Sequence, residues 1–110
     1  MADAFGWHLY MLRCGDGSLY TGITTDVERR IDEHRNSRRG ARYLRSRRPI
    51  ELLYSAQLGD RSAASVAEYA VKALDKSQKE ALAAGRLSLR DVLDRRESLQ
   101  RDRANRAPIR

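Results

Sequence analysis

Two short segments of alternating polarity, joined by a glycine-containing turn, constrain the fold of this 110-residue chain more than any other feature. Within residues 7–13, apolar side chains alternate on one face of an extended strand: Trp7, Leu9 and Met11. Residues 15–18, Gly-Asp-Gly-Ser, are typical of a turn, and residues 19–23 return as a second strand. The sequence therefore predicts a β-hairpin.

The length of the hairpin loop decides which tyrosines share a face of the sheet. A two-residue turn would leave Tyr10 and Tyr20 on opposite faces. A three-residue loop, with Gly17 in the left-handed conformation, would instead pair Tyr10 with Gly22 and put both tyrosines on one face. The patterns of the two strands allow either loop, and a site that uses both tyrosines requires the longer one.

The next segments predict a helix and a third strand. Thr25-Asp26-Val27-Glu28 fits a capping box in which Thr25 is the cap and Glu28 bonds back to it, so we expect a helix from there to about Asn36. After Pro49, apolar residues alternate along a strand with one apolar face: Ile50, Leu52, Tyr54, Ala56 and Leu58.

Three further helices are predicted, over residues 62–74, from Ser77 to about Gly85, and over residues 88–99, the last opened by a Ser88-x-x-Asp91 cap. The fold class is therefore α+β, a small three-stranded antiparallel sheet flanked by helices, with extra helices toward the C-terminus.

The length fits one domain, over residues 1–99, followed by a basic tail at 100–110 that we expect to be flexible. The single cysteine, Cys14, excludes an internal disulfide and favours a reducing compartment. No apolar run reaches the roughly 20 residues that span a bilayer, and residues 1–6 lack the basic opening of a signal peptide. We therefore expect a cytoplasmic protein.

The net charge of +7 is concentrated in one segment. Residues 35–48 contain no acid and these arginines: Arg35, Arg38, Arg39, Arg42, Arg45, Arg47 and Arg48. Guanidinium groups fit phosphate oxygens in a bidentate fork, and a dense cluster releases counterions from a polyanion. Nucleic acid is the expected partner, and an acidic protein or membrane surface is the weaker alternative. The general preference of this chain for arginine over lysine does not explain the absence of acids.

Two charged or titratable groups of the first predicted helix can reach the same site. Arg30 and His34 are four residues apart, on a stripe beside the apolar pair Val27 and Ile31. In the helix over residues 62–74, Glu68 lies at the edge of the apolar face. A carboxylate there needs either a cation of the chain, such as Arg30, or a bound metal ion.

These residues fall within longer motifs: Trp-His-Leu-Tyr at 7–10, Leu-Tyr-Thr-Gly-Ile-Thr-Thr-Asp-Val-Glu-Arg-Arg at 19–30, and Glu-Tyr-Ala-Val-Lys at 68–72. In these motifs the chain resembles the GIY-YIG nuclease domain and, within it, small stand-alone bacterial proteins. The resemblance covers about residues 7–82, and its long middle motif is the specific one. It implies a metal-dependent endonuclease that hydrolyses DNA phosphodiester bonds, selects by structure rather than sequence, and serves in DNA repair or recombination.

The resemblance also implies roles for the site residues. Tyr20 would be the general base or would orient the water, with Tyr10 as its hydrogen-bond partner or as the alternative base. Arg30 would clamp the scissile phosphate. His34, expected to titrate near neutral pH, would relay a proton or bond a phosphate oxygen. Gly22 would let the backbone lie close to the substrate.

Glu68 is implied as the ligand of a single Mg²⁺ or Mn²⁺. The sequence also departs from the larger nucleases of the family. His8 replaces a glycine, Ile23 stands where some members have a lysine, and no asparagine follows Glu68 at the family distance, where Gln78 is the candidate substitute. The missing lysine and asparagine favour an alternative function, a non-catalytic nucleic-acid-binding module with a degenerate site.

Overall fold

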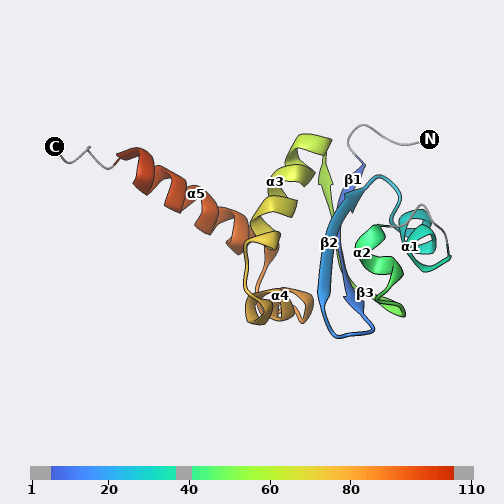
Figure 1. The fold of residues 1–110 in the computed structure, drawn as a ribbon. Helices are drawn as coiled ribbons and strands as arrows, with labels where there is room; N and C mark the ends of the chain where they lie inside the picture. Colours follow the sequence, from blue (N-terminus) through green and yellow to red (C-terminus); the bar gives the residue numbers. More distant parts are fainter. Residues whose placement is uncertain (1–5, 37–40, 106–110) are drawn as a thin grey trace.

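The computed structural model describes residues 6–36 and 41–105, and these form the elements labelled in Figure 1. The strands are β1 (Trp7–Cys14), β2 (Leu19–Thr24) and β3 (Ile50–Gly59). The helices are α1 (Val27–Asn36), α2 (Arg42–Arg45), α3 (Arg61–Lys72), α4 (Lys76–Ala83) and α5 (Leu89–Asn105). The predicted α+β fold, with a three-stranded antiparallel sheet flanked by helices, is confirmed.

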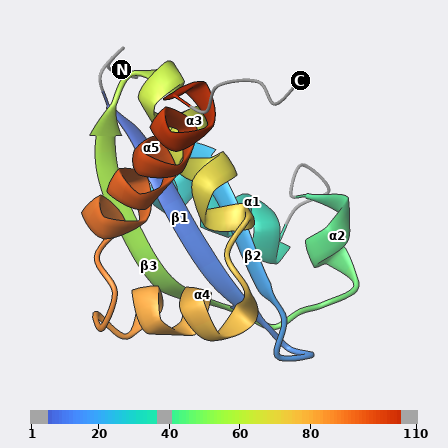
Figure 2. The ribbon, with the colours of Figure 1, turned by 90° about the vertical axis from the view of Figure 1, so that its left-hand side faces the viewer.

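The sheet has the order β2-β1-β3, so β1 is hydrogen-bonded along both edges. Helices cover both faces of the sheet, and β1 is therefore buried on both (Figures 1 and 2). Its alternation is the predicted one: Leu9 and Met11 point to one face, and Tyr10 and Leu12 to the other. Each of these four side chains is at most 1% exposed.

The two faces carry separate apolar clusters. Leu9 and Met11 pack against α3, α4 and α5, chiefly through Ala67, Val71 and Leu82. The opposite face packs against α1 and α2 and includes residues from both: Tyr10, Leu12, Cys14, Ile31, Leu44 and Ile50. The sheet thus separates an α3–α5 side from an α1–α2 side, and the second side contains both site tyrosines.

The hairpin has the three-residue loop. The Cys14 N–H donates to the Ser18 carbonyl at 2.9 Å, and Gly17 has a φ of 85°, a left-handed conformation that glycine adopts without strain. Tyr10 therefore pairs with Gly22. Both tyrosines lie on the face that α1 covers.

The expectation that alternate residues of 50–58 share one face is wrong. The pairing of β1 with β3 shifts by one residue: Met11 lies opposite Tyr54, whereas Leu12 lies opposite Leu52. Such an irregularity inserts a residue, and the side chains beyond it change face. The start of β3 therefore packs toward α1, and its second half packs toward α3.

Three helices begin at an aspartate rather than at the hydroxyl residue where the sequence placed their starts. Asp26, Asp60 and Asp75 each accept a backbone N–H three residues ahead, at 3.1, 2.8 and 2.8 Å. The predicted starts were Thr25, Ser62 and Ser77. A carboxylate cap satisfies the same donor as a hydroxyl and adds a negative charge that favours the helix N-terminus.

Helix α5 opens as predicted, with the Asp91 N–H bonded to Ser88 Oγ at 3.0 Å, but it continues to Asn105 instead of ending at 99. Residues 89–105 contain neither glycine nor proline and are rich in good helix formers, which accounts for the longer helix. Residues 106–110 of the predicted tail lie outside the described part. Throughout that part, every helix is too short or too polar to cross a bilayer.

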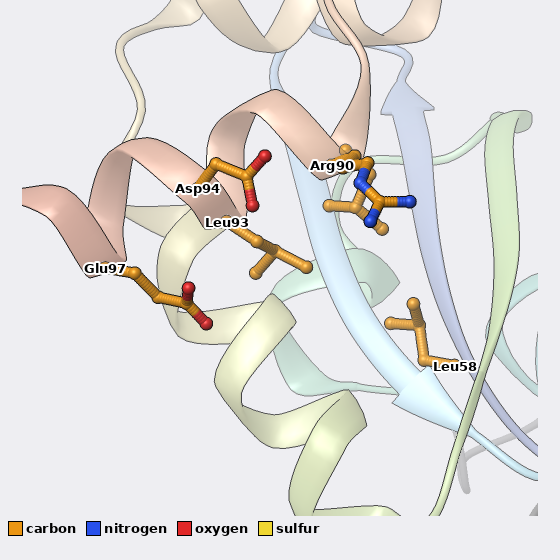
Figure 3. Close-up of a pocket in the computed structure, with 6 residues that line it drawn as sticks. Leu58, Arg90, Leu93, Asp94 and Glu97 are labelled. Carbon is orange, nitrogen blue, oxygen red and sulfur yellow. The ribbon is translucent and has the colours of Figure 1, made fainter.

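A groove lies between α5 and the end of β3, on the side of the sheet away from the two tyrosines (Figure 3). Its lining mixes apolar and charged side chains: Leu58, Leu89, Arg90, Leu93, Asp94 and Glu97. None of the residues that the sequence assigned to a site lines this groove.

The cap of α1 gives a direct test of the local structure. Replacing Asp26→Ala removes the acceptor of the Arg29 N–H and should lower the free energy of unfolding by about 1 kcal/mol. The matched variant Thr25→Ala should change it by less than about 0.5 kcal/mol. Urea unfolding followed by circular dichroism measures both free energies. A larger loss of stability in Thr25→Ala than in Asp26→Ala would show that Thr25 is the cap, as the sequence predicted.

Candidate active site

The structure brings together four of the predicted site residues, on the α1–α2 side of the sheet. Tyr10 comes from β1 and Tyr20 from β2, and Arg30 and His34 come from successive turns of α1. The ring centroids of Tyr20 and His34 are 5.6 Å apart, and those of Tyr10 and Tyr20 are 6.3 Å apart. The spacing along α1 and the three-residue hairpin loop together produce this cluster.

His34 is fully buried and held by three hydrogen bonds. Its Nε2 lies 2.8 Å from Tyr10 Oη, and its Nδ1 accepts the backbone N–H of Ala41 at 3.0 Å. Its carbonyl oxygen accepts from Arg48 Nε at 2.9 Å. Because the side chain is 0% exposed, the imidazole does not reach a phosphate in this conformation. In this conformation the His34 ring contacts the cluster through Tyr10.

The ionisation of His34 differs from the sequence-based expectation. Burial, followed by the positive charges of Arg30 and Arg48, lowers its pKa from the ordinary 6.5 to about 4, against an opposing effect of Glu33. The ring is therefore neutral at physiological pH rather than half-charged. A neutral imidazole carries one ring N–H, which gives the hydrogen bond to Tyr10 a definite direction.

Tyr10 is 1% exposed and poorly suited to lose its proton. Burial is the main reason that the pKa of Tyr10 is raised well above 10, and Tyr20 raises it further. Arg30 acts in the opposite direction, through a hydrogen bond and its positive charge. Tyr20 is only partly buried and lies nearer the surface. Of the two phenols, Tyr20 is the one that an external substrate can approach.

Arg30 places a cation beside the phenols. Its guanidinium interacts with Tyr10 and forms an ion pair with Glu33 at 3.3 Å, and its side chain is 29% exposed. The Glu33 carboxylate neutralises part of this charge, but the open part of the arginine side chain remains accessible to an anion.

The structure gives a reason for the glycine at position 22 that the sequence did not indicate. A Cβ at this position would lie 2.5 Å from Tyr10 Oη and 2.6 Å from Tyr10 Cζ. Gly22 is itself buried, and the space beside it is filled by the Tyr10 phenol. The glycine thus makes room for a tyrosine, where the sequence analysis expected it to make room for the substrate.

Glu68 belongs to α3, which packs on the other face of the sheet (Figure 1). Its carboxylate pairs with Lys72 at 3.5 Å, one turn along the helix, instead of with Arg30, and its side chain is 26% exposed. Among the described residues, no three acidic, histidine or cysteine side chains gather as a ready-made metal cage. A single carboxylate of this kind suits Mg²⁺, which retains several waters and shares its coordination with substrate phosphates.

The arginine-rich segment is partly bonded within the fold. Arg35 donates to the Ile50 carbonyl at 3.3 Å, and Arg47 forms an ion pair with Asp16 at 3.2 Å. Arg48 bonds the His34 carbonyl, as described above. Arg42 and Arg45 are exposed on α2. Arg38 and Arg39 lie outside the described residues.

The sequence analysis missed one contributor, and two residues that it named bond other groups than expected. The Ala41 N–H is a backbone group, so no side-chain pattern indicates it. Arg48 was identified as a phosphate ligand, whereas here its Nε bonds the His34 carbonyl. Gln78 bonds the Asp75 N–H at 3.1 Å and closes the capping box of α4, so it does not stand in for the missing asparagine.

The contact between Gly22 and Tyr10 predicts a costly substitution. Gly22→Ala should lower the free energy of unfolding by about 1–3 kcal/mol, because the buried ring of Tyr10 must move. Adding Tyr10→Phe removes the oxygen atom nearest the new methyl group, so the double variant should be more stable than the sum of the two single effects. Urea unfolding of all four proteins gives this comparison, and strict additivity would contradict the contact.

The buried imidazole predicts a stability change in acid. Between about pH 6.5 and about pH 4 the unfolded chain protonates His34 while the folded chain does not, so the free energy of unfolding falls as the pH falls. The effect should be on the order of 3 kcal/mol. His34→Gln should lack this component, and its stability curve should be flatter than that of the wild type over the same window. Parallel curves for the two proteins would show that His34 titrates normally.

The amino-acid sequence matches the family model of the GIY-YIG catalytic domain over residues 6–81. The UPF0213 protein DP2720 of Desulfotalea psychrophila is 52% identical over 80 residues, 73% of each chain. The UPF0213 protein YhbQ of Escherichia coli K12 is 54% identical over 78 residues, 71% of this chain and 77% of that protein. The solution structure of the UPF0213 protein BH0048 from Bacillus halodurans is similar with 40% identity and a TM-score of 0.48, over 78% of this chain and 90% of that one. The chain therefore belongs to the GIY-YIG nuclease domain family.

Proposed function

We propose that this protein is a metal-dependent endonuclease that hydrolyses DNA phosphodiester bonds and selects its target by structure rather than by sequence. The observation that supports this most is the buried bond between His34 Nε2 and Tyr10 Oη, which holds one phenol beside the more exposed Tyr20 and the Arg30 guanidinium. Burying two polar side chains against each other is costly unless the pair is satisfied, so a purely structural role would be served more simply by apolar residues.

Tyr20 is the proposed general base, with Tyr10 as its partner. A phenol of ordinary pKa near 10 is a weak base at neutral pH and needs help from a neighbouring cation or from a more acidic water. Arg30 supplies the neighbouring cation. The same guanidinium would bind the scissile phosphate and offset the charge that builds on it during attack. The water would be activated and the bond broken in a single displacement.

Nucleases of this family use divalent metal ions, and we propose Mg²⁺ or Mn²⁺ held by Glu68. When bound, such an ion supplies Lewis-acid stabilisation of the phosphate and the departing 3′ oxygen. Among the described residues, Glu68 would be the single protein ligand of this proposed site. Affinity for the ion should therefore be low until nucleic acid contributes its own oxygens.

The segment from Arg42 to Arg48 is the proposed phosphate-binding surface, with Arg42 and Arg45 as its exposed cations. Contacts of arginine with phosphate position a duplex without reading its bases, which is why we propose selection by structure. Nicked, flapped or branched DNA would be such targets, and a role in DNA repair or recombination in the cytoplasm would follow.

The alternative is a nucleic-acid-binding module without turnover. Two observations favour it: Ile23 occupies the place of a lysine found in some family members, and Gln78 is engaged in the cap of α4. In this case the Tyr10–His34 pair would survive as a structural feature of the fold.

Cleavage assays separate the two functions. Purified protein is incubated with labelled duplex, single-stranded, flap and branched DNA, in Mg²⁺, Mn²⁺ or EDTA, beside Tyr20→Phe and Glu68→Ala. We expect metal-dependent cutting by the wild type, a loss of at least about a hundredfold in both variants, and unchanged DNA binding by Tyr20→Phe. Lys76→Ala, an exposed change at the start of α4, is the matched control for handling and contamination.

Binding measured over a salt series completes the comparison. Salt-sensitive binding without cutting by any of the proteins would favour the non-catalytic module. Cutting that persists equally in Tyr20→Phe and Glu68→Ala would identify a contaminant and reject the proposed site.

A further inference from the structure

The hydrogen bond between Ala41 and His34 fixes which ring nitrogen of His34 carries the proton. A backbone N–H can only donate, and the Ala41 N–H points at Nδ1 from 3.0 Å. Nδ1 therefore carries no proton. A neutral imidazole has one N–H, so the proton must be on Nε2.

The position of this proton also determines the direction of the hydrogen bonds at the two tyrosines. Nε2–H donates to Tyr10 Oη across 2.8 Å, so Tyr10 accepts from His34. Arg30 also hydrogen-bonds the Tyr10 oxygen, and a guanidinium can only donate. The Tyr10 hydroxyl hydrogen is then directed to its remaining partner, Tyr20. A hydrogen bond donated to the Tyr20 oxygen orients the phenol that we propose as the base.

In an isolated pair of a phenol and a neutral imidazole, the hydrogen bond would run in the opposite direction. A phenol, with an ordinary pKa near 10, is a far stronger donor than a neutral imidazole N–H, so the tyrosine hydroxyl would normally donate to the ring. That arrangement would put the proton on Nδ1, facing the Ala41 N–H. Two buried donors would then oppose each other, and leaving a buried donor unsatisfied costs about 1–3 kcal/mol.

The same chain segment holds His34 from two sides. Ala41 bonds the ring, and Arg48 bonds the backbone carbonyl of His34. Between them, the fully buried Leu44 anchors α2 in the apolar cluster that also contains Tyr10. Arg42 and Arg45 on this helix are exposed to a polyanion. The segment is thus joined both to the buried hydrogen bonds and to the proposed phosphate-binding surface.

We propose that Ala41, through its backbone N–H, sets the direction of the hydrogen bonds that run from His34 through Tyr10 to Tyr20, and that segment 41–48 therefore positions the reactive phenol as well as binding phosphate. The catalytic part of this inference rests on the proposed endonuclease function. The direction of the hydrogen bonds does not depend on it, and it can be measured on the protein alone.

Nitrogen-15 NMR of the imidazole rings shows which ring nitrogen of His34 carries the proton in the wild-type protein, and therefore the direction of its hydrogen bond to Tyr10. Spectra recorded at about pH 8, above the ordinary histidine pKa, should show His34 with its proton on Nε2. The other histidine is an internal control, because His8 Nδ1 lies 2.9 Å from the Gly6 carbonyl, an acceptor, and should carry its proton on Nδ1. His8→Gln assigns the signals. A proton on His34 Nδ1 would overturn the proposal.

Replacing one backbone atom tests whether the Ala41 N–H determines which nitrogen of His34 carries the proton. Replacing Ala41 by lactic acid in a semisynthetic protein turns the amide into an ester, which removes the N–H but keeps the carbonyl that accepts from Leu44 N–H. The proton of His34 should move to Nδ1, and the cleavage rate at saturating DNA should fall on the order of tenfold while DNA affinity is unchanged. The matched control is the amide protein assembled by the same ligation.

The possible results are distinct. An ester protein that keeps the proton on Nε2 and cleaves at the wild-type rate rejects Ala41 as the positioning residue. If the wild type does not cleave DNA, the endonuclease proposal fails, while the NMR comparison of ester and amide proteins still decides whether Ala41 sets the direction of the hydrogen bonds.

Discussion

The hydrogen bond between Tyr10 and His34 is the contact on which the arrangement of the α1–α2 side depends. It joins the central strand to α1 inside an apolar cluster, where neither group has water as an alternative partner. The rest of this side follows from it: Gly22 is needed to make room for the phenol, and Ala41 is needed to satisfy the second ring nitrogen. In the proposed function, this pair would hold the Tyr10 phenol beside Tyr20.

The central strand β1 contributes side chains to both apolar clusters, and the candidate site lies on only one of its two faces. Leu9 and Met11 belong to a hydrophobic cluster with side chains of α3, α4 and α5. One residue further along, Tyr10 faces a cluster in which hydrogen bonds and apolar contacts are mixed. Substitutions of Leu9 and Met11 should act through packing, whereas those of Tyr10 also change hydrogen bonds and charge interactions. Within residues 6–36 and 41–105 the strands form a single sheet, so the two faces of β1 serve both clusters.

Periodicity and turn chemistry were enough to predict the fold class, the faces of β1, and the four-residue spacing that brings Arg30 and His34 to one site. The three-residue hairpin loop was one of two allowed by the sequence, and the structure selects it. Other features could not be predicted because their causes lie in tertiary contacts. No residue type marks the shift in the pairing of β3 with β1, and each aspartate cap lies only one or two residues from the hydroxyl residue that was predicted to start the helix. The Ala41 N–H has no side-chain signature at all.

The position of Glu68 places a geometric demand on any catalysis by this site. The phenols and Arg30 lie on one face of the sheet, and α3 packs on the other, so a phosphate that meets both must lie at an edge rather than over the centre of a face. Strand β2 is an edge strand, it contains Tyr20, and α3 contacts it directly. The ion pair with Lys72 is long and partly exposed, and surface pairs of this kind contribute little to stability, so the carboxylate can exchange this partner at small cost. The edge of β2 is therefore where substrate, carboxylate and base would meet.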